Sequence, residues 1–280
     1  MDETTKKQLR KMAVNVRKGI LTGTFHAKSG HPGGSLSVAD LLVYLYECKM
    51  HVDPKNPEDP DRDRLVLSKG HTAPALYAVL AEKGFFDKSE LEKLRHIGAM
   101  LQGHPCIQTP GIDMSSGSLG QGISAACGMA LAGKLHHKDY HVYTVLGDGE
   151  IQEGQVWEAA MFASHYQLEN LTAIIDNNGL QIDGKITEVC SPEPIDEKFR
   201  AFGWYVILVE NAHDFDQLEQ AFAEAEQITG KPVAIIQKSI KGKGVSFMEN
   251  QVSWHGVAPN AQQYAQAMQE LEAALAELED

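Results

Sequence analysis

Short apolar runs alternate with helical patterns along most of the chain. Five runs have strand character, at residues 64–67, 142–146, 171–175, 205–209 and 233–237. Apolar residues recur at helical spacing in the segments between them, at 73–83, 122–135, 155–165 and 215–227. Strands that are separated by helices pair in parallel, and the helices cover both faces of the sheet. The pattern therefore predicts an α/β fold with an open, mostly parallel sheet.

The N-terminal segment carries an amphipathic pattern of its own. Apolar residues from Leu9 to Ile20 are spaced for one helix, which we expect to end near the glycines at 19–23. Glycine-rich residues 30–34 then predict a loop, after which Ser37 is placed to cap a second helix.

The C-terminal tail predicts one further amphipathic helix. Its apolar stripe consists of Tyr264, Met268, Leu271, Leu275 and Leu278. Glu and Gln occupy the opposite side. We expect residues 1–260 to form one domain and the helix of residues 261–280 to dock on its surface. Docking against a partner chain is the alternative.

Composition and charge limit the binding partners and the cellular location that we expect for the protein. The 25 Lys and Arg residues are outnumbered by 38 Asp and Glu, giving a formal net charge of -13. This charge disfavours nucleic acid and anionic membranes as partners. The chain carries no apolar run of the roughly 20 residues that a membrane span needs, no secretory signal and no paired CxxC cysteines. We expect a cytoplasmic protein in which any bound phosphate is held by local groups.

Two polar turns follow neighbouring strands. Gly147-Asp148-Gly149 comes directly after the second strand, and Asn178 follows the third. The carboxyl ends of parallel strands meet at one edge of a sheet, so Asp148 and Asn178 are expected to converge there. One carboxylate and one amide oxygen suit Mg²⁺, with a backbone carbonyl beyond Asn178 as a third ligand, whereas zinc is disfavoured.

A second phosphate cradle precedes a predicted helix. Residues 98–122 are rich in Gly, Ser and Pro, and a loop of this length usually lines a functional site. Its end, at residues 115–122, presents consecutive N–H groups at a helix start, which attract anions. The glycine order differs from the dinucleotide fingerprint, so a dinucleotide is not expected.

Histidines recur beside Gly or Pro in the predicted loops. They are His31, His71, His104 and His255, and a further histidine, His26, lies nearby without such a neighbour. Glycine lets such loops approach a ligand closely, and histidine transfers protons near neutral pH. These residues are candidates for proton transfer and for hydroxyl binding.

The motifs together resemble the N-terminal, diphosphate-binding portion of transketolases, from about residue 6 to residue 259. The resemblance rests on SGHPGG at 29–34, LSKGH at 67–71, GHP at 103–105, GSLGQG at 117–122, GDGEIQEG at 147–154, DNN at 176–178, IDG at 182–184 and WHG at 254–256. It implies a thiamine diphosphate-binding fold in which residues 1–260 form the diphosphate domain. It also implies thiamine diphosphate and Mg²⁺ as cofactors, with Ca²⁺ or Mn²⁺ as alternatives.

The resemblance also assigns roles to residues of this chain. Asp148, Asn178 and the Leu180 carbonyl match metal ligands. The positions that match cofactor-binding residues are Lys69, His71, Gly117, Ser118, Leu119, Gly149, Glu150, Asn178, Lys241 and His255. The histidines matched to sugar binding and proton transfer are His31, His71, His104 and His255. Glu153 matches a carboxylate at the interface between two cofactor-binding domains.

Transketolases continue beyond this point into a pyrimidine-binding domain and a third domain, which have no counterpart here. We therefore expect ketol transfer between sugar phosphates only with a partner chain, in an α2β2 enzyme of the pentose phosphate pathway. Alternatives are a transketolase acting on a sulfonated or branched sugar, the α chain of a 2-oxoacid dehydrogenase, a deoxyxylulose-phosphate synthase relative and an inactive scaffold. A metal-dependent hydrolase is a further alternative, although HExxH is absent.

Overall fold

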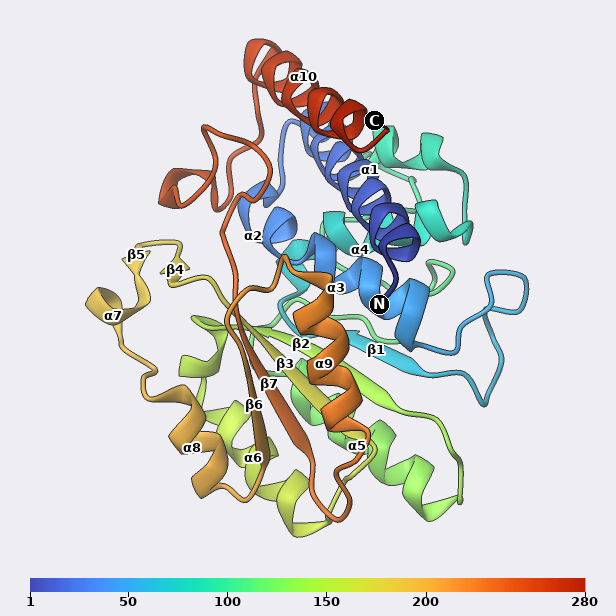
Figure 1. Ribbon diagram of the computed structural model, residues 1–280, viewed down its shortest axis with the longest axis vertical. Coiled ribbons are helices and arrows are strands. Elements are labelled where there is room, and N and C mark those ends of the chain that lie inside the picture. The colour runs from blue at the N-terminus through green and yellow to red at the C-terminus, as the bar shows by residue number, and fades with distance from the viewer. Residues whose placement is uncertain (280) are drawn as a thin grey trace.

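A five-stranded, fully parallel sheet lies at the centre of the protein (Figure 1), whose computed structural model describes residues 1–279. In spatial order its strands are β1 (Arg64–Leu67), β2 (Val142–Gly147), β3 (Leu171–Asn177), β7 (Val233–Lys238) and β6 (Tyr205–Val209). A small antiparallel pair, β4 (Leu180–Gln181) and β5 (Gly184–Lys185), follows β3. The predicted fold class is confirmed, and all five predicted strands are present.

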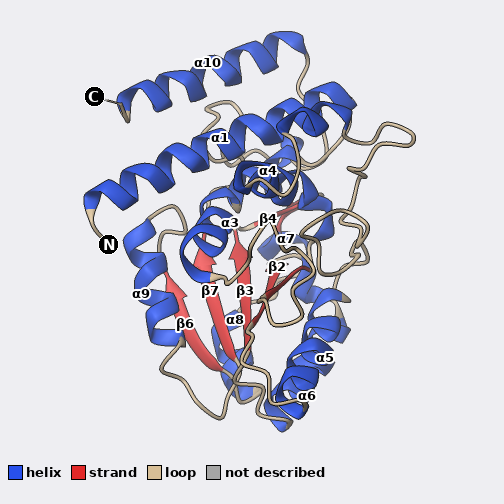
Figure 2. Cartoon of the chain, turned by 90° about the vertical axis from the view of Figure 1, so that its right-hand side faces the viewer, coloured by secondary structure: helices blue, strands red, loops and turns tan. Residues whose placement is uncertain are grey.

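Helices cover both faces of the sheet (Figure 2). One face carries α1 (Glu3–Ala27), α3 (Ala39–Tyr44), α4 (Ala73–Lys83) and α9 (Phe215–Ala225), and the other carries α5 (Gly122–Leu135), α6 (Gly154–His165) and α8 (Ile195–Ala201). Successive strand residues enter opposite cores: Val145 packs with the first set and Leu146 with the second. This alternation explains why the strands are mostly apolar.

Shorter helical elements connect these layers. They are α2 (Pro32–Ser37), α7 (Ile186–Val189), a π-helical turn at Leu45–Lys49 and 3₁₀ turns at Gly70–Thr72, Lys88–Lys93, Glu150–Gln152 and Val252–Trp254. The last helix, α10 (Ala261–Glu277), begins at a capping box formed by Asn260 and Gln263. It lies along α1, where the Tyr264 and Phe25 rings stack with centroids 4.2 Å apart.

Three N-terminal predictions were wrong. Helix α1 continues to Ala27, because its glycines allow close packing; a Cβ on Gly19 would lie 3.0 Å from the Ala78 Cβ of α4. The expected loop at 30–34 is largely replaced by α2, which begins at Pro32, a favourable first helical residue. Ser37 ends α2 and caps no helix; its hydroxyl donates to Gly34 O and to Asp176.

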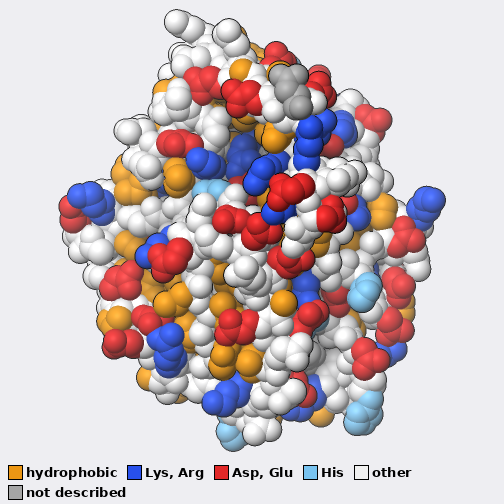
Figure 3. All heavy atoms as spheres, viewed as in Figure 1, with side chains coloured by type: hydrophobic (Ala, Val, Ile, Leu, Met, Phe, Trp, Pro, Cys, Tyr) orange, Lys and Arg blue, Asp and Glu red, His pale blue; other side chains and the backbone are white. Residues whose placement is uncertain are grey.

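Acidic side chains are spread over the face seen in Figure 3, in keeping with the net charge of -13. Within residues 1–279, none of the helices combines the length and the apolar character that crossing a membrane requires.

Candidate active site

The candidate site lies at the carboxyl edge of the sheet. Gly147, the last residue of β2, is in register with Asp176 of β3, so the turns after both strands lie side by side. Asp148 accepts a hydrogen bond from the Gly179 N–H at 2.5 Å and another from the Gly149 N–H at 2.8 Å. The turns that carry Asp148 and Asn178 therefore meet, as the strand order predicts.

Three oxygen groups in these turns suit a small, hard cation. Asn178 Oδ1 accepts from the Leu180 N–H at 3.1 Å, and the Leu180 carbonyl accepts from Lys241 Nζ at 3.0 Å. Together with the Asp148 carboxylate they form a donor set of one charged and two neutral oxygens. Such a set fits Mg²⁺, which keeps its other positions for water and phosphate.

Asp148 is a buried carboxyl in an unfavourable electrostatic setting. Its side chain is 2% exposed, and burial together with the nearby Asp176 charge raises its pKa to about 6. A divalent cation at this carboxylate would act in the opposite direction and favour the charged form. The site thus fits a bound metal ion.

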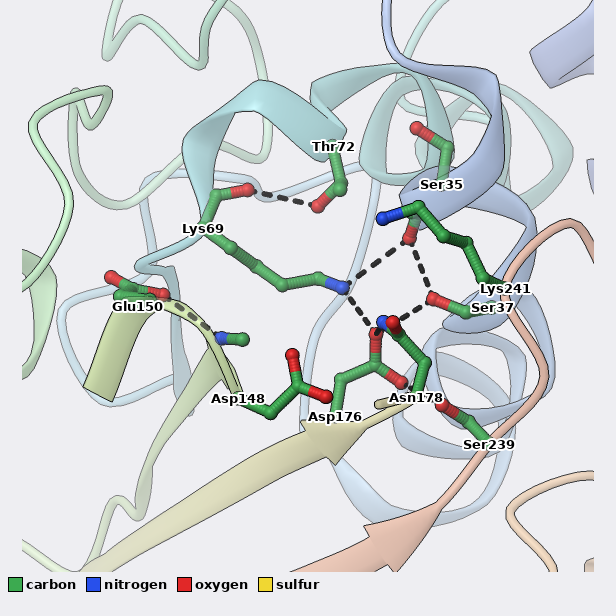
Figure 4. A network of polar contacts seen from close by, with 12 residues as sticks. Ser35, Ser37, Lys69, Thr72, Asp148, Glu150, Asp176, Asn178, Ser239 and Lys241 are labelled. Atoms are coloured by element: carbon green, nitrogen blue, oxygen red, sulfur yellow. Dashed lines mark hydrogen bonds and ion pairs between the residues drawn. The ribbon is translucent and has the colours of Figure 1, made fainter. Parts of the chain in front are cut away.

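Asp176 is the centre of a buried polar network beneath these turns (Figure 4). Its carboxylate accepts from Ser37 Oγ at 2.7 Å and Asn178 Nδ2 at 3.1 Å, and it forms an ion pair with Lys69. Burial alone would raise the Asp176 pKa, but the Lys69 ammonium together with hydrogen bonds from Ser239 and Ser37 lowers it. The network fixes the amide of Asn178. Asp176 was not among the predicted site residues; a charged residue at the end of a buried strand was the available signal.

Glu150 joins the two glycine-rich turns. Its buried carboxylate accepts from Ser68 Oγ at 2.5 Å, from the Gly120 N–H at 2.9 Å and from the Gly147 N–H at 3.0 Å. Burial raises the pKa of Glu150. The carboxylate links the 117–122 loop to the turn after β2.

Three of the predicted histidines form one cluster. The ring centroid of His31 lies 5.2 Å from that of His71 and 5.6 Å from that of His255, and the His71 and His255 centroids are 5.3 Å apart. Burial, reinforced by nearby cations, lowers the pKa of His31 to about 4, that of His255 to about 3 and that of His71 well below its usual value. The three imidazoles are therefore neutral at pH 7 and can accept or donate hydrogen bonds to hydroxyl groups.

Lys241 connects this cluster to the metal-suited turn. Its Nζ lies 2.9 Å from His255 Nδ1 as well as 3.0 Å from the Leu180 carbonyl. Burial, with the repulsion of Lys69, lowers the pKa of Lys241 to about 8. The two lysines supply the local positive charge that the acidic chain otherwise lacks.

A cavity of about 360 Å³ joins most of these groups. The sequence-predicted residues that line it are His31, Lys69, His71, Gly117, Leu119, Asp148, Gly149, Glu150, Glu153, Asn178, Leu180, Lys241 and His255. His104 and Ser118 instead line an adjoining hollow, which Gly117 also lines. Tyr77 Oη holds the His104 carbonyl at 2.7 Å. His104 therefore lies in a different hollow from the other three histidines.

The sequence of the chain matches a family model along nearly its whole length. The model is that of the transketolase, thiamine diphosphate binding domain, and it matches residues 9–275. The chain belongs to the transketolase family. The resemblance stated from the motifs is thereby confirmed.

Known transketolases differ in how much of their length this chain covers. It is 46% identical to the 6-deoxy-6-sulfo-D-fructose transketolase subunit SqwG of Clostridium sp. (strain MSTE9), covering 94% of this chain and 96% of that one. It is 42% identical to one of the apulose-4-phosphate transketolase subunits of Phocaeicola vulgatus, covering 94% of this chain and 93% of that one. Human transketolase is 43% identical, but only 40% of its length is matched.

A solved structure also shows that the chain corresponds to only part of a complete transketolase. Transketolase from Campylobacter jejuni superposes with a TM-score of 0.90 and 30% identity, covering 99% of this chain and 46% of the other. The chain therefore spans less than half of this transketolase, while it spans nearly all of the two subunits.

Proposed function

We propose that this transketolase-family chain is the diphosphate-binding subunit of a two-chain enzyme that transfers a two-carbon ketol unit from a ketose to an aldose. The observation that carries the proposal is the coverage: this chain matches 96% and 93% of two transketolase subunits and 40% of human transketolase. The remaining domains then come from a second polypeptide, and we infer an α2β2 assembly.

We assign the cofactor's diphosphate and its Mg²⁺ to the carboxyl edge of the sheet. Asp148, Asn178 and the Leu180 carbonyl would hold the ion, and Lys69 and Lys241 would supply positive charge. Support comes from the oxygen-only donor set and from the glycines at 147 and 149, which let phosphate approach the backbone closely. Thiamine diphosphate supplies the electron sink that ketol transfer needs.

We assign the predicted histidines to binding of the sugar substrate and to proton transfer. Neutral imidazoles at His31, His71 and His255 would bind hydroxyl groups and exchange protons with them near neutral pH. His104 would act from the adjoining hollow. The cluster in contact with Lys241 supports this assignment, because it places proton acceptors beside the proposed cofactor site.

A partner would cover the open side of the cavity. Leu119 and Ile182 line it and are 39% and 63% exposed, which is unusual for apolar side chains beside a buried catalytic centre. We also assign Glu153, an exposed residue at the same cavity, to the contact between cofactor-binding domains.

The substrate is the least constrained part of the proposal. The two transketolase subunits described above are named for a sulfonated and a phosphorylated ketose. We propose that the ketose donor is anionic. As a working assignment, we place the enzyme in the cytoplasmic pentose phosphate pathway. A panel of ketose phosphates and 6-deoxy-6-sulfofructose distinguishes the two classes.

Reconstitution tests the proposed function. The purified chain, the polypeptide carrying the remaining transketolase domains from the same organism, and their mixture are each assayed with Mg²⁺, thiamine diphosphate and the donor panel. We expect ketol transfer in the mixture alone, rising until the two chains are equimolar. Full activity of the isolated chain would refute the two-chain proposal.

A further inference from the structure

Arg95 lies between two histidine loops, outside the cavity described above. It follows the 3₁₀ turn at Lys88–Lys93 and has φ +62°, a left-handed conformation that a non-glycine residue adopts only when its surroundings hold it. Its backbone N–H donates to the Leu101 carbonyl at 2.8 Å. The backbone at Arg95 is thus fixed by the segment that leads to His104.

The Arg95 guanidinium contacts both loops. Its Nη1 donates to Ser29 Oγ at 2.9 Å, and Ser29 is two residues before His31. On the other side, a Cβ on Gly103 would lie only 2.9 Å from Arg95 Cζ, so the guanidinium packs directly against the backbone that precedes His104. Any side chain at 103 would displace it.

Arg95 retains an unneutralised charge at this position. Within residues 1–279 it has no carboxylate at ion-pair distance, and its buried Nε has no hydrogen-bond partner. Burying a donor without a partner is energetically unfavourable. A residue retained at such a cost, in a strained backbone conformation, points to a role in the site.

We infer that Arg95 is a positioning residue for the proposed ketol transfer, fixing the spacing between the His31 and His104 loops. The inference rests on the proposed function for its catalytic meaning, and on the contacts with Ser29 and Gly103 for its geometry.

The charge of Arg95 has a second effect. After burial it is the largest cause that lowers the pKa of His31 and of His104, so it helps to keep both imidazoles neutral.

The other charged and titratable groups that face these histidines are still present when Arg95 is replaced. His31 is flanked by the rings of His71 and His255 and is also affected by Lys241 and His104. His104 is held through its carbonyl by Tyr77. A change in titration after substitution of Arg95 therefore reports the loss of the guanidinium, both of its charge and of the loop spacing that it sets.

The test is a histidine NMR titration of the full chain, with His31 and His104 assigned through His→Gln variants. Arg95→Met should raise the pKa of both imidazoles, whereas Arg10→Met, which removes an exposed arginine with the same change in net charge, should not. Unchanged titration of both histidines in a folded Arg95→Met protein would overturn the role. This readout needs no ketol transfer, so it fails or succeeds independently of the proposed function.

Arg95→Lys separates charge from geometry and serves if Arg95→Met does not fold. Lysine keeps the charge but not the planar, multi-donor contact. Both histidines should titrate as in the wild type, while kcat of the reconstituted enzyme falls roughly tenfold to hundredfold. In Arg95→Met the acid limb of the pH–activity profile should also move to higher pH. A lysine variant with wild-type kcat would overturn the positioning role.

Discussion

The Lys69 ammonium and the Asp176 carboxylate form an ion pair in which both side chains are almost completely buried, at 2% and 0% exposure. The pair connects the turn after β1 to the end of β3. Asp176 also accepts a hydrogen bond from Asn178, so the pair supports a residue that we assign to the metal. A buried ion pair therefore lies beneath the site, at the carboxyl edge of a mostly apolar sheet.

Breaking this pair should cost far more than breaking one at the surface. Asp176→Asn leaves the Lys69 ammonium buried without its counter-charge, and we expect a loss of about 3–5 kcal/mol in the free energy of unfolding. The control is Glu210→Gln, which breaks the exposed Lys238–Glu210 pair and should cost less than about 1 kcal/mol. Urea denaturation measures both; equal losses would show that the Lys69–Asp176 pair has no special role.

A glycine near the histidine cluster should be intolerant of a side chain. A Cβ on Gly33 would lie 2.8 Å from the Trp254 carbonyl, so Gly33→Ala should push apart the segments that carry His31 and His255. We expect a cost of about 1–3 kcal/mol and reduced activity of the reconstituted enzyme.

Gly128→Ala is the matched control for Gly33→Ala. Gly128 lies inside α5 with open space around its Cβ position, so alanine should stabilise the isolated chain by about 0.5–1 kcal/mol. Thermal and urea unfolding of the two variants should therefore shift in opposite directions. Shifts in the same direction would contradict the packing argument.

The sheet and the turns of Asp148 and Asn178 could be predicted because their signals are local, whereas Lys69, Glu150 and Lys241 were assigned only through the resemblance to transketolases. Apolar runs locate the strands, and the parallel order of strands brings the turn of Asp148 to that of Asn178. The end of α1 could not be predicted, since Gly19 breaks an isolated helix but here allows contact with Ala78 of α4. Tertiary packing overrides helix propensity at such positions.

Hydrogen bonds between residues that are far apart in the sequence could not be predicted either. Ser37 resembles a helix cap in sequence, but its hydroxyl bonds Asp176, which is 139 residues away. The contact of Arg95 with Ser29 likewise depends on how two loops fold onto each other. Spacing along the chain carries no signal for such pairs.

Acid should destabilise the folded chain through half-buried histidines. His141 is half-buried beside Thr172, with its Nε2 2.9 Å from Oγ1, and the loss of hydration there lowers its pKa to about 4. The unfolded chain takes up this proton near its ordinary pKa of about 6.5, before the folded chain does. The stability that His141 contributes is therefore complete above pH 6.5 and is lost as the pH falls toward 4, by about 3 kcal/mol.

His141→Phe tests this linkage. It removes the titrating group while keeping an aromatic ring against Tyr143, whose centroid is 4.6 Å from that of His141. Urea unfolding between pH 7.5 and 4.5 should show a smaller loss of stability in the variant than in the wild type. Parallel stability curves would contradict the neutral state of His141.

The central claim is that this chain holds the cofactor's diphosphate through a metal ion at Asp148. Calorimetric titration of the full chain with thiamine diphosphate, with and without Mg²⁺, tests it most directly. We predict Mg²⁺-dependent binding to the wild type that Asp148→Asn weakens by roughly a hundredfold or more. An exposed control, Asp139→Asn, should leave binding unchanged. Wild-type, Mg²⁺-dependent affinity in a folded Asp148→Asn protein would contradict the account.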